Sequence, residues 1–130
     1  MADLTNYHRD EIIQFFWRND ADTKTPAATI YLSLHTTATD ATGAGTEMTG
    51  GTPAYARVAV AFDDPAGTGT TQNTAAEAVN CSGETVVAIA FWNHASAGQM
   101  IAHENLASSI ATNDGDTLDW AAGDLVINFA

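Results

Sequence analysis

Two short runs of alternating apolar residues constrain the fold of this chain more than any other feature of its sequence. The apolar members alternate with smaller or more polar residues; they are Ile30, Leu32 and Leu34 in the first run and Val58, Val60 and Phe62 in the second. Successive side chains of a β-strand point to opposite faces, so this spacing predicts two half-buried strands. The long connection between them is rich in Thr, Gly, Ala and Asp.

The remaining chain has the same character. The run at 84–92, ETVVAIAFW, is apolar on both faces, which predicts a central strand covered on two sides, and the runs at 116–120 and 123–129 return to alternation. Gly, Asn and Asp clusters separate the runs about every ten residues. We therefore expect an all-β fold, an antiparallel two-sheet sandwich with jelly-roll or Greek-key connections, over residues 27–130.

The N-terminal segment has a different period. Large apolar residues recur near helical spacing over 4–18, which predicts one α-helix, and a polar linker over 19–26 ends at Pro26. A helix with this much aromatic surface must be covered, so we expect it to pack on its own sheet; packing on a partner is the alternative. A chain of 130 residues is the size of one domain, and we expect 1–130 to form a single domain.

The excess of acidic over basic residues limits the classes of partner that the protein can bind. Four basic residues against 16 acidic ones give a formal charge of -12, which disfavours nucleic acid and anionic membrane surfaces. We expect neither a cleaved leader nor a membrane span, because the N-terminus lacks a signal pattern and no apolar run is long enough. The single cysteine, Cys81, excludes an internal disulfide, and no basic neighbour activates its thiol.

Candidate catalytic groups are few. His94, His103 and Glu104 match no zinc spacing, and turn or edge positions account for them better. Ser33 and His35 share one face of a strand, but no nucleophile elbow or paired acid accompanies them. We expect no enzyme activity and no cofactor.

Two weaker site hypotheses remain. The carboxylates of Asp114, Asp116 and Asp119 are close enough in sequence to be candidate calcium ligands, although the spacing differs from a calcium loop. The favoured alternative is a hairpin with a tight turn at Asp114–Gly115. Trp92 and Trp120 fall in predicted strands, where a core role is common. If both were exposed, they would indicate a soluble carbohydrate-binding module.

The order of motifs resembles a family of small bacteriophage virion structural proteins, described as tail-fibre-like or decoration proteins. The resemblance covers nearly the whole chain, and its most specific parts are YLSLHT at 31–36, Glu47, and the segment from Gly50 to Arg57. It implies a non-enzymatic virion component, made in the host cytoplasm and placed on the outer surface of the particle. A capsid decoration (cement) protein is the favoured role, because the sequence shows no coiled-coil heptads or fibre shaft; a tail-fibre or tail-tip module for host attachment is the alternative.

The long connection is the predicted contact element. We define the 36–54 loop as residues 36–54 and expect it to reach a neighbouring subunit or the shell, because ordering such a loop is costly unless contacts bury it. The expected partners are the major capsid protein or other virion proteins, together with further copies of the chain in a homo-oligomer, with a trimer favoured. The predicted contact residues are Thr39, Asp40, Thr42, Glu47, Met48 and Thr49.

Overall fold

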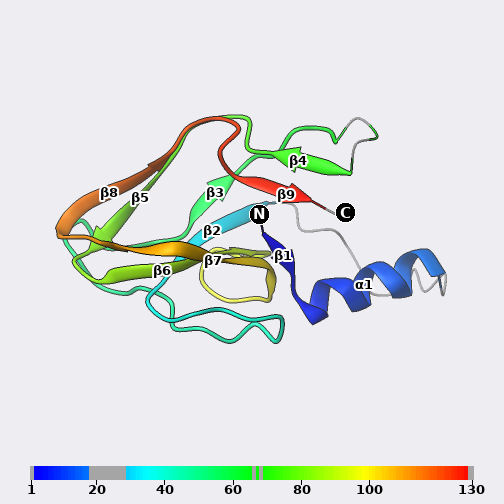
Figure 1. Ribbon diagram of the computed structural model, residues 1–130, viewed down its shortest axis with the longest axis horizontal. Coiled ribbons are helices and arrows are strands. Elements are labelled where there is room, and N and C mark those ends of the chain that lie inside the picture. Colours follow the sequence, from blue (N-terminus) through cyan, green and yellow to red (C-terminus); the bar gives the residue numbers. More distant parts are fainter. Residues whose placement is uncertain (1, 18–28, 66, 68, 129–130) are drawn as a thin grey trace.

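Strands dominate the computed structural model, which describes residues 2–17, 29–65, 67 and 69–128 (Figure 1). The elements in chain order are β1 (Asp3–Leu4), α1 (Asn6–Trp17), β2 (Ile30–His35), β3 (Val58–Val60), β4 (Thr70–Gln72), β5 (Glu77–Ser82), β6 (Thr85–Trp92), β7 (Met100–Ala111), β8 (Asp114–Trp120) and β9 (Val126–Asn128). The predicted all-β class with one N-terminal helix is confirmed. The predicted linker at 19–26 lies outside the described residues.

The largest sheet has the strand order β1-β7-β6-β2-β3, and all its pairs are antiparallel. The apolar run at 84–92 forms β6 in the middle of this sheet, as predicted. In the register of β2 and β6, Leu32 lies opposite Phe91 and Leu34 opposite Ile89. All four side chains are buried on the core side of the sheet. Ser33 and His35 on the other face of β2 are buried too, so the prediction of a half-buried strand is wrong for the second half of β2.

Two smaller ribbons complete the fold. β4 pairs with β9, and β5 pairs with β8, both antiparallel. β7 and β8 carry the chain from the five-stranded sheet to the β5–β8 ribbon through a turn in which the Asp116 N–H donates to the carbonyl of Asn113 at 3.0 Å. The expected turn at Asp114–Gly115 is therefore present, but it joins strands of different sheets and does not close a hairpin.

The core lies between the five-stranded sheet and the two ribbons. Its fully buried side chains include Leu32, Leu34, Val79, Val86 and Phe91. The half-buried Phe62 meets Phe91 edge to face, with ring centroids 5.5 Å apart. Cys81 is also fully buried, and burial raises the pKa of its thiol, as expected for a structural residue.

The helix begins at Asn6, slightly later than predicted, because Thr5 is its N-cap. The Thr5 hydroxyl accepts from the His8 N–H at 3.4 Å, and the Thr5 N–H donates to the carbonyl of Ile101 at 2.9 Å. The start of α1 is thus fixed on β7, which α1 contacts. Figure 1 shows the helix at the end of the molecule opposite the β5–β8 ribbon. Ile13 on α1 is 50% exposed.

Candidate functional site

A single arginine joins three segments at one end of β2. Arg57 donates from Nε to Glu47 Oε1 at 2.9 Å and from Nη2 to Oε2 at 2.7 Å, a two-pronged ion pair. Its Nη1 donates to the carbonyls of His94 and Ala97, both at 2.8 Å. The guanidinium also lies 3.7 Å from the centroid of the Trp92 ring, a cation–π contact. Arg57 therefore ties the 36–54 loop to β6 and to the turn at 93–99.

Glu47 receives a third hydrogen bond, which links the ion pair to β2. The Tyr55 hydroxyl donates to Glu47 Oε1 at 2.8 Å and accepts from the Leu34 N–H at 3.0 Å. Burial disfavours the ionised carboxylate, but the hydrogen bonds from Arg57 and Tyr55 outweigh it and hold the pKa of Glu47 below its ordinary value. Burial raises the pKa of Tyr55, so its hydroxyl stays a proton donor. We call Glu47, Tyr55, Arg57 and Trp92 the Arg57 cluster.

Ser33 and His35 form a buried pair next to Trp92 of this cluster. Ser33 Oγ donates to the carbonyl of Ala90 at 3.2 Å and accepts from the Trp92 Nε1–H at 2.8 Å. His35 Nε2 lies 2.9 Å from the same oxygen. The direction of this contact is set by the tautomer of His35.

A catalytic serine–histidine pair needs access for a substrate and a third group that orients the imidazole. Both side chains are fully buried, and His35 Nδ1 has no hydrogen-bond partner in the described part of the chain. Burial lowers the pKa of His35 to about 4, so the ring is neutral at pH 7. The arrangement supports a structural role for Ser33 and His35.

The 36–54 loop is held by hydrogen bonds within the chain. The Thr36 N–H donates to the carbonyl of Thr46 at 2.8 Å, and the Met48 N–H donates to the carbonyl of Leu34 at 2.9 Å. Asp40 Oδ1 accepts from the N–H groups of Thr42 at 2.8 Å and Ala44 at 3.3 Å. These bonds lower the pKa of Asp40, the one from the Thr42 hydroxyl most of all. Intramolecular contacts thus supply much of the ordering that the sequence suggested a partner would provide.

The six predicted contact residues are not equivalent. Thr39 and Met48 are buried, and Thr39 contacts His103 and Asn105 of β7 through its hydroxyl and its N–H. Glu47 belongs to the Arg57 cluster. Asp40, Thr42 and Thr49 are exposed, and contact with a partner stays a prediction for them.

The three aspartates of the calcium hypothesis have separate roles. Asp114 Oδ1 accepts from the Thr52 N–H at 2.6 Å, and Asp116 Oδ2 accepts from the Asn113 N–H at 2.7 Å. Asp119 lies on β8 opposite Ala78. Within the described ranges, no three His, Cys, Asp or Glu side chains form a group that could hold a metal ion.

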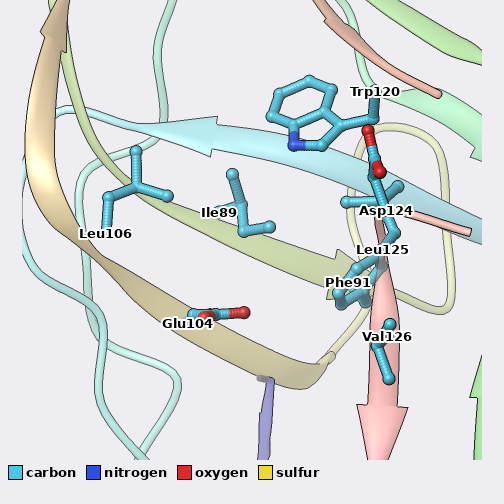
Figure 2. Close-up of a pocket in the computed structure, with 8 residues that line it drawn as sticks. All are labelled: Ile89, Phe91, Glu104, Leu106, Trp120, Asp124, Leu125 and Val126. Atoms are coloured by element: carbon cyan, nitrogen blue, oxygen red, sulfur yellow. The ribbon is translucent and has the colours of Figure 1, made fainter.

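The two strand tryptophans differ in their surroundings. Trp92 is covered on one face by Arg57, and its ring is parallel to that of His35 at 6.3 Å, so it is no open sugar platform. Trp120 is half-buried and lines a cavity of about 170 Å³ between the five-stranded sheet and the chain that runs from β8 into β9 (Figure 2). The other lining residues are Ile89, Phe91, Glu104, Leu106, Asp124, Leu125 and Val126.

Comparison with known proteins shows the family to which the chain belongs. A family model described as Podophage GP4 fiber I protein gp80 matches residues 3–128. None of the curated proteins matches the chain. Among the described residues, no helix is both long and apolar enough to cross a membrane. Because the match covers nearly all of the sequence, the chain belongs to this family of bacteriophage virion structural proteins, which are of the tail-fibre type.

Proposed function

We propose that the protein is a non-enzymatic subunit of a phage tail fibre and contacts other virion proteins. The observation that carries this proposal is the match of residues 3–128 to a family described by a fibre protein. That description favours the fibre role. The sequence alone, in contrast, favours capsid decoration. Both roles place the chain on the outside of the particle, where a charge of -12 is not brought against packaged DNA.

The Arg57 cluster suits a structural subunit. A two-pronged Arg–carboxylate pair with two further carbonyl acceptors fixes the 36–54 loop against the turn at 93–99, and neither loop has to be ordered by a ligand. Loops held in one conformation lose less entropy when they dock on a neighbouring subunit. The exposed residues Asp40, Thr42 and Thr49 are the proposed contact points in a homo-oligomer, for which we favour a trimer.

Capsid decoration is the second candidate. The described residues form strands of at most 12 residues and one helix of 12 residues, which resembles a compact module more than a fibre shaft. A decoration protein would occupy many equivalent positions on the head, whereas a fibre subunit would be confined to the tail.

Immunogold electron microscopy separates the two roles. Antibodies against the purified chain are applied to intact virions, with a phage that lacks this gene product as the control. Gold confined to the tail supports the fibre proposal. Gold spread over the head would contradict it and favour decoration, and absence of label from intact and disrupted particles alike would contradict both.

A further inference from the structure

Two large apolar side chains are exposed among the described residues, and they lie at opposite ends of the molecule. Ile13 on α1 is 50% exposed, and Ile110, next to the last residue of β7, is 38% exposed. Figure 1 shows α1 at one end and the junction of β7 with β8 at the other. The two side chains therefore cannot shield each other within one copy of the chain. A single exposed isoleucine is ordinary, so the charges beside each one decide what it can bind.

On α1 the exposed isoleucine lies beside an arginine. Arg9 and Ile13 are four positions apart, which places their side chains on one face of the helix with Cβ atoms about 5–6 Å apart. Arg9 is exposed, whereas the side chain of Arg57, the other lysine or arginine of the described ranges, is nearly buried. We call Arg9 and Ile13 the α1 face, an apolar surface that carries a free positive charge.

At the far end of β7 the exposed isoleucine lies near a carboxylate. Ile110 is opposite Val86 in the register of β6 and β7, and the Thr112 hydroxyl donates to the carbonyl of Glu84 at 2.7 Å. Glu84 is two residues before Val86, so it is the diagonal neighbour of Ile110 on one face of the sheet, about 7–8 Å away. Glu84 is exposed, and its Oε2 accepts from the Thr49 N–H at 3.3 Å. We call Glu84 and Ile110 the β7 end.

The α1 face and the β7 end match in chemistry and in spacing. Each combines one exposed isoleucine with one charge, and the two charges are opposite. The long arginine side chain makes up the difference between the spacing of the pair on the helix and that of the pair on the sheet. Two β7 ends placed together would instead bring Glu84 carboxylates together on a chain of charge -12. The complement of each surface is therefore the other surface on a second copy.

We propose that the chain associates head to tail, with the α1 face of one copy on the β7 end of the next. Ile13 packs on Ile110, and the Arg9 guanidinium pairs with the Glu84 carboxylate, while Asp10 points away from that carboxylate. The inference rests on the homo-oligomer of the proposed function and adds which surfaces meet. A contact between two different surfaces closes into a ring, such as a trimer, if the rotation between copies allows it, and otherwise forms an open filament.

The test uses two variants of the full chain and analytical ultracentrifugation. Arg9→Glu/Ile13→Ser changes the α1 face, and Glu84→Arg/Ile110→Ser changes the β7 end, so each variant keeps one intact surface. Each variant alone should need at least about tenfold more protein to assemble than the parent chain. An equal mixture should form a 1:1 dimer that grows no further, because only one contact can form. The contact is small beside a standard interface of about 1,600 Å², so concentrations up to about 1 mM are needed.

A charge swap separates the ion pair from the apolar packing. Arg9→Glu and Glu84→Arg should each weaken association about tenfold, and the double variant Arg9→Glu/Glu84→Arg should regain most of the loss, because it restores opposite charges. Asp119→Arg is the matched control, since it makes the same change of charge at an exposed position near the other end of β8 and should assemble like the parent chain. Melting temperatures close to that of the parent chain show that each variant is folded.

Three outcomes would overturn the proposal. The first is a parent chain that stays monomeric over the whole concentration range, which leaves the fibre role to be decided by labelling of the particle. The second is a parent oligomer that both surface variants leave unchanged, which would keep the homo-oligomer and place its contact elsewhere. The third is a loss of assembly in only one of the two variants, with no 1:1 dimer in the mixture, which would indicate a contact between like surfaces.

Discussion

Arg57 and Glu47 form a two-pronged ion pair, with N–O distances of 2.9 and 2.7 Å, although both residues lie outside regular strands. The Arg57 side chain is only 6% exposed, and its remaining donors go to backbone carbonyls of the turn at 93–99. The pair is therefore a fixed connection between two loops, in contrast to an ion pair at the surface, where water weakens the attraction.

Replacing Arg57 should destabilise the protein strongly. Arg57→Ala would leave the Glu47 carboxylate partly buried without its cation and two carbonyls without their donor, and we expect a loss of about 3 kcal/mol. In a domain of this size that loss lowers the melting temperature by about 10 °C. Arg57→Lys keeps the charge but not the bidentate geometry of the guanidinium, and it should lose less stability than Arg57→Ala. Arg9→Ala, on the exposed side of α1, is the control; an equal effect of the two alanine variants would contradict the assigned role.

The buried His35 should make stability fall on acidification. Its pKa is about 4 in the folded protein and about 6.5 in an unfolded chain, so the unfolded state binds more protons between these values. The stabilisation is fully present above pH 6.5 and is lost as the pH falls toward 4. Glu47, whose pKa is lowered, adds a further loss at more acidic pH.

The measurement for His35 is the free energy of unfolding at several pH values between 7 and 4. We expect the parent chain to lose up to about 3 kcal/mol over this range and His35→Gln to lose clearly less. The difference between the two curves isolates His35, because His8, whose pKa burial also lowers, is present in both proteins. Parallel curves would show that His35 does not control the acid sensitivity.

Exposed positions of the 36–54 loop should govern assembly without affecting the fold. Replacing Ala44 and Thr49 by arginine should lower the oligomer mass in solution and the incorporation into particles, while the melting temperature changes little, because both side chains are exposed. Ser108→Arg on the exposed part of β7 is the matched control. If the double variant assembles as well as this control, the contact lies elsewhere.

Chelation should leave the protein unchanged. The carboxylates of Asp114 and Asp116 accept hydrogen bonds from backbone N–H groups, so the turn is held without a metal. We expect the same melting temperature with calcium and with a chelator. A rise of several degrees on adding calcium would restore the metal hypothesis, because a ligand bound well above its dissociation constant stabilises the folded state by a few kcal/mol.

The strands that alternate in sequence were the predictable part of the fold. β2 directs its apolar residues to the core and its polar residues, which are buried as well, to the other face, and β6 lies in the middle of its sheet, so both leave a visible hydrophobic pattern. β7 has no such pattern, because Met100–His103 are buried on both faces whereas 107–111 are exposed on both. β4 is only three residues long and carries no apolar side chain, so no hydrophobic period could reveal it.

The Arg57 cluster was not predictable from local patterns. Glu47 and Arg57 meet because the loop returns to the end of β2, and that approach depends on the tertiary fold. One signal was present in the sequence: Arg57 is the only lysine or arginine after Lys24 in a strongly acidic chain. Such a residue beside a strand is expected to find a carboxylate, but the sequence does not say which one.

A cryo-electron microscopy reconstruction of the intact virion tests the central claim most directly. The account predicts that the nine strands and the helix α1 of the described residues fit density in the tail, in repeated copies that contact other virion proteins. The claim would be contradicted if the same fold were found only on the head lattice, or if a fully interpreted particle contained no density that the chain fits.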